Sequence, residues 1–154
     1  MNVDSSEVWK RCLELVHAEM AGFVERFVTP LTKAYEPGFG HALGTGSYLA
    51  MPDASYVLTN EHVITKGAGG HVAHQPGGPG QEYHAVDTTR THSKPWPVDI
   101  AIARVWDAPS GSRMPIPPML FDAKYQAVDG ELLFFIGYPG STALRDEQIS
   151  EASL

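Results

Sequence analysis

The stretch Tyr56-Val-Leu-Thr-Asn-Glu-His-Val-Ile64 decides the fold that we expect for this chain. It begins as a strand, because its first four residues are aromatic, apolar or β-branched. The strand pattern breaks at Asn60, and a single imidazole, His62, follows two residues later. The stretch therefore predicts a strand over about 55–60 that places a histidine just beyond its end.

Further strand-like stretches lie on both sides of it. The Gly-rich stretch Leu43-Gly-Thr-Gly-Ser-Tyr-Leu49 comes before it, and an acid leads the later stretch Val98-Asp-Ile-Ala-Ile-Ala103. The apolar stretch Leu132-Leu-Phe-Phe-Ile-Gly-Tyr-Pro139 comes last. With turn signals between them, we expect strands near 41–51, 55–60, 69–74, 81–90, 99–106 and 131–137. Six short strands with no intervening helix predict a mainly β chain forming a small antiparallel barrel.

Residues 4–28 have the period of an amphipathic helix instead. We expect this helix to end before Pro30, because a residue that precedes proline avoids the helical region. Its apolar stripe is predicted to pack on the barrel, with partner binding or targeting as the alternative. The chain thus divides into a helix over 1–30, a barrel over 31–140 and, over 141–154, either a flexible polar tail or the start of a linker. The apolar positions of the helix are Val8, Trp9, Cys12, Leu13, Leu15, Val16, Met20, Phe23, Val24 and Phe27.

The composition of the chain argues against several kinds of partner and cellular location. The net charge of −7 and the lack of a basic patch argue against nucleic acid and against anionic membranes as partners. The single cysteine, Cys12, cannot form an internal disulfide, which suits a reducing compartment or a bacterial origin. Asp4 and Glu7 replace the cationic start of a signal peptide, so we expect a cytoplasmic protein.

Taken in order, the four stretches resemble the first half of the trypsin-like serine peptidases, and most closely the bacterial HtrA/Deg-type branch. A Gly-Thr/Ser-Gly strand, a Leu-Thr-Asn-x-His-Val turn, an Asp-hydrophobic-Ala strand and a Gly-Tyr-Pro strand end recur in that family. The resemblance implies a chymotrypsin-type barrel with His62 as the catalytic base and Asp99 as its orienting carboxylate. It implies no cofactor and no metal. The other candidate acids, Asp87, Asp107, Asp122 and Asp129, lack the Asp-Ile-Ala-Ile context of Asp99.

The nucleophile of such a peptidase is missing from the sequence. The family motif Gly-x-Ser-Gly-Gly or Gly-x-Ser-Gly-Ser does not occur. Ser110 comes closest, but Ala108 stands where the motif has glycine. Ser141 follows the Gly-Tyr-Pro end as a linker residue, and Ser47 lies inside a strand. The resemblance also assigns the oxyanion hole and the specificity pocket to a second barrel, so we expect this chain to be inactive as a peptidase by itself.

Three interpretations therefore stay open. The chain is the N-terminal part of a serine endopeptidase that cleaves peptide or protein substrates, or a non-catalytic barrel that binds a partner or itself through its inter-barrel face. The third interpretation is one half of a split protease.

Other candidate sites are weaker. A metal at His71 and His74 is not favoured, because residues i and i+3 of a strand point to opposite faces. Cys12 lies on the apolar stripe, where a free cysteine is expected to be buried and inert. Trp96, just before Asp99, is expected to pack in its loop.

Overall fold

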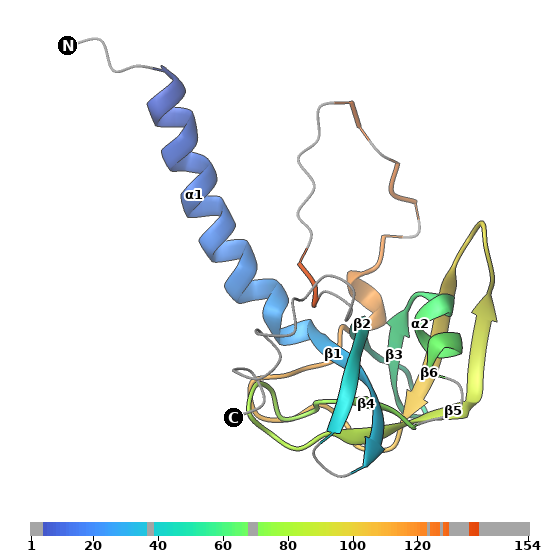
Figure 1. Ribbon diagram of the computed structural model, residues 1–154. Coiled ribbons are helices and arrows are strands. Elements are labelled where there is room, and N and C mark those ends of the chain that lie inside the picture. The colour runs from blue at the N-terminus through green and yellow to red at the C-terminus, as the bar shows by residue number, and fades with distance from the viewer. Residues whose placement is uncertain are drawn as a thin grey trace.

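The computed structural model describes residues 5–36, 39–67, 71–122, 124–126, 128–129 and 136–138 (Figure 1). A long helix comes first, six strands form a barrel, and a short helix lies between the third and fourth strands. The elements are α1 (Ser5–Val24), η1 (Glu25–Phe27), β1 (Val28–Glu36), β2 (Phe39–Ala50), β3 (Ser55–Thr59), α2 (Glu61–Lys66), β4 (His71–His74), β5 (His84–Lys94), β6 (Ile100–Val105) and η2 (Pro118–Leu120).

The six strands close into a barrel in the order β1-β2-β3-β6-β5-β4. Every neighbouring pair is antiparallel, including β1 with β4, which closes the sheet. This confirms the predicted mainly β fold, a six-stranded antiparallel chymotrypsin-type barrel preceded by a helix. In the closed order each strand has a neighbour on both sides, so both sides of β3 and β6 are held by neighbouring strands.

One of the six strands differs from the sequence prediction. The first strand is β1, which begins at Val28, so α1 ends at Val24 rather than near residue 28. Pro30 lies inside β1 opposite Thr45, but the β1–β4 ladder starts only at Thr32. Pro30 therefore occupies a stretch of β1 that has no ladder partner on the β4 side, where a missing N–H is tolerated. The predicted strand 131–137 lies mostly outside the described residues.

The short helix α2 was also missed. It covers only Glu61–Lys66, which is too short for a periodic signal in the sequence. Its Val63 side chain is 3% exposed and belongs to the barrel core, which fixes the helix on the barrel. The core cluster consists of Leu31, Val57, Val63, Val72, Val86, Ala103 and Val105.

The helix α1 does not pack on the barrel, contrary to the prediction. It extends away from the barrel, and its contacts within the described residues are concentrated on η1 (Figure 1). Trp9 is 57% exposed and Phe23 is 51% exposed. Cys12 is exposed as well, so the expectation of a buried thiol was wrong. No helix of the described residues is long and apolar enough to cross a membrane.

Gly46 in β2 lies where a side chain would collide with the buried core. A Cβ there would overlap Val57 Cγ2 and lie 3.2 Å from Leu31 Cδ1, and both of these side chains are fully buried. We expect Gly46→Ala to lower the free energy of unfolding by about 1–3 kcal/mol, as overpacking does in other cores. Urea denaturation followed by tryptophan fluorescence measures the change.

The matched control is Gly22→Ala in α1, where a new Cβ meets nothing within 4 Å. This change is expected to leave barrel stability unchanged while raising helix propensity by up to about 1 kcal/mol. Equal effects of the two substitutions on the unfolding of the barrel would contradict the close packing at Gly46.

Candidate active site

His62 is placed by the junction of β3 with α2. Thr59 ends the strand, and Asn60 takes an extended conformation (φ −78°, ψ 146°) before the helix begins at Glu61. Because Val63 points into the core, the neighbouring His62 is turned to the barrel rim. The side chain of His62 is 47% exposed.

Asp99 lies at the same rim, directly before the first residue of β6. The antiparallel register pairs Thr59, at the end of β3, with Ala101, near the start of β6. The residues just beyond these two strand ends are therefore neighbours in space although 37 positions apart in the chain. Asp99 has a φ of +51°, a left-handed conformation that aspartate adopts more readily than most residues.

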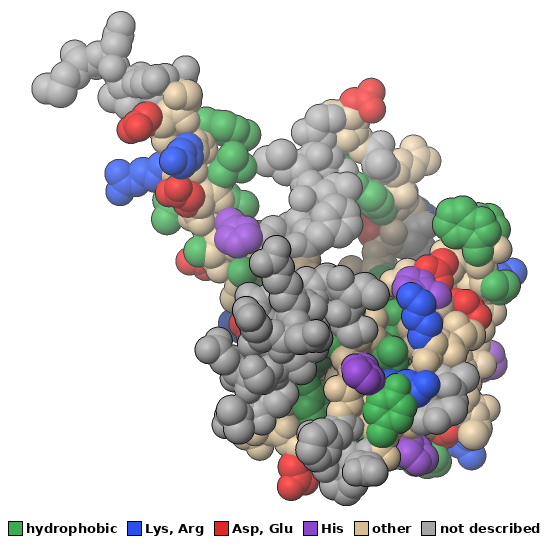
Figure 2. Space-filling view, in the orientation of Figure 1, with side chains coloured by type: hydrophobic (Ala, Val, Ile, Leu, Met, Phe, Trp, Pro, Cys, Tyr) green, Lys and Arg blue, Asp and Glu red, His purple; other side chains and the backbone are tan. Residues whose placement is uncertain are grey.

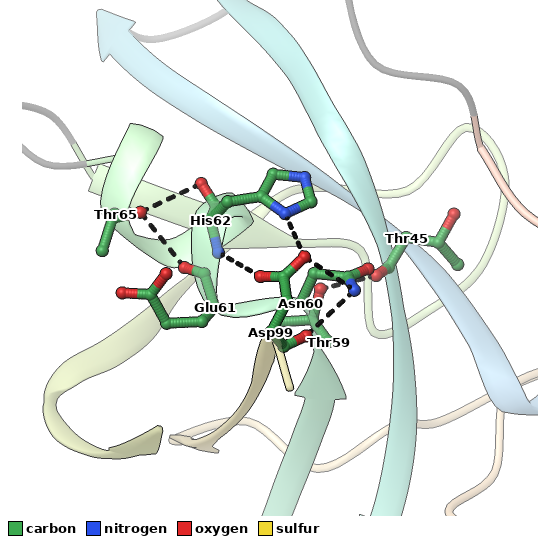
Figure 3. Close-up of polar contacts among 7 residues, drawn as sticks. All are labelled: Thr45, Thr59, Asn60, Glu61, His62, Thr65 and Asp99. Carbon is green, nitrogen blue, oxygen red and sulfur yellow. Dashed lines mark hydrogen bonds and ion pairs between the residues drawn. The ribbon is translucent and has the colours of Figure 1, made fainter. Parts of the chain in front are cut away.

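The imidazole and the carboxylate form a close pair. His62 Nδ1 lies 2.6 Å from Asp99 Oδ2, and the backbone N–H of His62 donates to Asp99 Oδ1 at 3.0 Å (Figure 3). Both carboxylate oxygens are thus occupied by the same residue, which fixes the plane of the carboxylate and the rotation of the ring. With Asp99 as acceptor, the proton of the neutral imidazole is held on Nδ1, and Nε2 is left as an acceptor.

Asn60 adds a second support for the aspartate. Its side-chain Nδ2 donates to the backbone oxygen of Asp99 at 3.0 Å and to Oδ2 at 3.3 Å. In the sequence Asn60 ends the strand pattern and belongs to the turn motif before His62, but its contact with Asp99 became visible only in the structure. Its role is to hold the left-handed backbone and the carboxylate in one orientation.

The ionised form of Asp99 is favoured by these contacts. The backbone N–H of His62 is the main cause that lowers the pKa of Asp99, and the hydrogen bond from the His62 ring and that from Asn60 act in the same direction. Partial burial acts in the opposite direction. The carboxylate is therefore negative at neutral pH and able to stabilise an imidazolium beside it.

The remaining ring nitrogen of His62 is open. Figure 3 shows it turned away from Asp99, on the outer side of the ring. Within the described part of the chain, no hydroxyl group donates to this nitrogen. The arrangement can accept a proton from a group brought to the rim, and it has the geometry of a general base with its orienting acid.

Three of the four sequence stretches are joined by Thr45. The Thr59 hydroxyl donates to the backbone oxygen of Thr45 at 2.7 Å, next to the site (Figure 3). The Thr45 hydroxyl donates to the backbone oxygen of Tyr138 at 3.1 Å. The Gly-Thr-Gly strand thus connects the strand that precedes His62 with the Gly-Tyr-Pro stretch, which the sequence could not show.

A second histidine–carboxylate pair lies elsewhere on the barrel and was not anticipated. His84 Nδ1 is 2.8 Å from Asp107 Oδ2, and both residues line a hollow together with Ser110. No hydrogen bond joins Ser110 to His84 among the residues described. Asp107 is 57% exposed and has no other hydrogen bond in the described structure, so this pair is held far less firmly than His62 and Asp99.

The remaining sequence candidates do not join the site. His71 is exposed, whereas His74 is fully buried and hydrogen-bonded to the Tyr48 hydroxyl at 2.8 Å. Burial is the main cause that lowers the pKa of His74 to about 4. No cluster of metal-ligating side chains occurs in the described residues. Ser141 lies outside them, and Ser47 stays in β2 opposite Leu58.

A closed antiparallel barrel with a histidine and an aspartate paired at its rim defines the class of trypsin-like folds. The comparison with family models agrees, because the model of the trypsin-like peptidase domain matches residues 44–153. The chain belongs to this family. The searches of curated proteins and of solved structures returned no match.

The hydrogen bonds to Asp99 predict how stability depends on pH. Because the folded-state pKa of Asp99 is below its ordinary 3.8, its contribution is fully present above that pH and is lost as the pH falls through the folded value. We expect the difference in unfolding free energy between the wild type and Asp99→Asn to be largest near neutrality and to shrink in acid. Chemical denaturation at a series of pH values measures it.

Glu82→Gln provides the control, because it removes an exposed carboxylate away from the rim. The difference in unfolding free energy between this variant and the wild type should not change over the same pH range. If the difference in unfolding free energy between Asp99→Asn and the wild type were also independent of pH, the proposed stabilisation of the carboxylate would be wrong.

Proposed function

We propose that this chain supplies the base and the orienting acid of a trypsin-like serine endopeptidase of the HtrA/Deg-type branch. The observation that carries the proposal is the 2.6 Å contact of His62 with Asp99, with the second ring nitrogen left open. His62 is the general base and Asp99 is the positioning acid. The nucleophilic serine comes from polypeptide outside these 154 residues.

The pair acts on a hydroxyl placed next to His62 Nε2. The hydroxyl attacks the carbonyl carbon of the scissile peptide bond while its proton moves to Nε2. Asp99 stabilises the positive charge that the ring then carries, and it keeps the ring from rotating. The same ring gives the proton to the leaving amine when the peptide bond breaks, so one histidine serves as base and then as acid.

The positions of Ser110 and Ser47 in the described structure support an external nucleophile. Ser110 lies in the hollow beside His84, not beside His62, and Ser47 is part of the barrel wall. The printed sequence also has no Gly-x-Ser-Gly-Gly or Gly-x-Ser-Gly-Ser motif. The amides of the oxyanion hole and the pocket for the substrate side chain belong to the same missing part.

The surface near the pair suits contact with another barrel. Val98, which directly precedes Asp99, is 60% exposed. Trp96, three residues before Asp99, is 85% exposed. Trp96 does not pack within its loop as the sequence suggested. Apolar side chains at this rim favour a second folded unit that covers them, either further along the polypeptide or on a separate chain of a split protease.

A fluorophosphonate probe tests where the nucleophile lies, because it reacts covalently with activated serines. We expect the 154-residue chain to remain unlabelled. Labelling should occur when the same chain is joined to, or mixed with, polypeptide carrying a Gly-x-Ser-Gly motif, and the label should map to that serine. Labelling of the 154-residue chain alone, at Ser110 or any other residue, would disprove the external nucleophile.

Two substitutions test the roles of the pair in the assembled peptidase. His62→Ala and Asp99→Asn should each lower kcat/KM by about 10⁴-fold. The first removes the base, and the second removes the negative charge beside the ring and adds an amide that can donate to Nδ1, which favours the wrong tautomer. Peptide hydrolysis under single-turnover conditions measures the loss. The matched controls are His84→Ala and Asp107→Asn, which break the second pair and should leave kcat/KM at the wild-type value. If the control substitutions cost as much as those at the rim, the assignment of His62 and Asp99 is wrong.

A further inference from the structure

The apolar line along α1 is regularly spaced. We define the α1 seam as Trp9, Leu13, Val16, Met20 and Phe23. These residues follow one another at steps of four, three, four and three positions. Such a strict alternation has a period of 3.5 residues, which is the pattern of a helix that pairs with another helix in a coiled coil. Val8, Cys12, Leu15 and Val24 add apolar surface beside this line, so the spacing of the seam, rather than the width of the apolar face, is the signal of helix pairing.

Four of the five residues of the α1 seam are open to solvent in the described structure, and Met20 is partly buried. Leu13 is 41% exposed and Val16 is 54% exposed, in addition to Trp9 and Phe23. The end of the seam nearest the barrel is anchored, because the ring of Phe23 packs edge-on against Phe27, whose side chain is 8% exposed. In proteins most of the stability of a helix comes from packing of its apolar face, so an unpacked seam favours a partner that covers it.

The charges on α1 favour a second copy of the same helix as that partner. The half near the N-terminus carries Glu7, Lys10 and Arg11, a net charge of +1. The half nearer the barrel carries Glu14 and Glu19, a net charge of −2. When two copies run antiparallel, the positive half of each lies against the negative half of the other. A membrane is a poorer fit, because the helix has no continuous basic face for anionic lipids.

We propose that α1 pairs with α1 of a second copy of this chain through the α1 seam, which makes the protein a homodimer. The barrel and its site do not obstruct this pairing. In Figure 1, α1 leaves the barrel on the side away from α2, the helix that carries His62. Figure 2 shows hydrophobic side chains on the projecting helix, clear of the barrel surface. A dimer formed in this way holds two barrels, each with an open rim.

The oligomeric state of the full chain tests the proposal. We expect light scattering after size exclusion to give a mass of twice 16.7 kDa for the wild type. Val16→Glu places a charge in the seam and should halve the mass to that of one chain. Leu15→Glu is the matched control, since Leu15 is the adjacent residue, is 62% exposed and lies outside the seam. This variant should remain dimeric.

Each other result overturns the proposal. A monomeric wild type means that the seam is unpaired or is covered within one chain, and a mass above two chains means a different assembly. Equal disruption by Val16→Glu and Leu15→Glu means that the seam does not form the interface. Near-UV circular dichroism checks that both variants keep a folded barrel. Sedimentation of the wild type with phosphatidylserine vesicles, without dimers in solution, would assign the helix to membranes instead.

Discussion

The carboxylate of Asp99 is the point on which the site depends. It accepts the ring proton of His62 through one oxygen and the backbone N–H of the same residue through the other. One aspartate therefore fixes both the side chain and the main chain of the histidine. This double contact requires β3 to end beside the start of β6, and the barrel meets the requirement through the antiparallel register of Thr59 with Ala101. Closure of the barrel holds that register, because neither strand is free to slip.

The two histidine–carboxylate pairs show that a short distance does not define a base. His62 with Asp99 and His84 with Asp107 have nearly equal separations of 2.6 and 2.8 Å. Asp99 is 24% exposed and is held by His62 and Asn60 together, whereas Asp107 is 57% exposed and is held by the ring of His84 alone. A general base must keep one orientation while its substrate reacts. Among the described residues, the contacts of Asp99 with His62 and Asn60 can fix that orientation, whereas the single contact of Asp107 with His84 cannot.

The barrel buries apolar side chains in its own core, whereas α1 exposes apolar side chains to solvent. The barrel is closed around its own core, and a short helix and the Thr45 contacts complete one end of it. The helix presents a regular apolar line outward, and its barrel end is held where Phe27 is buried. Arg113 and Met114 also donate to backbone oxygens of η1, which follows the helix. Among the described residues, the barrel has an open rim beside His62, and the helix exposes the α1 seam. The proposed nucleophile partner and the proposed second copy would occupy different surfaces, so the two associations are compatible.

The sequence alone determined the barrel class, the strands on either side of His62 and the choice of Asp99 over the other aspartates, because these depend on local patterns of alternation and on ordered motifs. It missed β1, because apolar residues continue from the helix across Phe27 and Val28 into the strand without a change that period analysis detects. It also missed α2, which is shorter than two helical turns. Only the tertiary structure decided that Asn60 supports Asp99, that Thr45 joins three separate stretches and that α1 stands away from the barrel. Each of these depends on which segments meet in space, and residues far apart in the chain carry no local signal of that meeting.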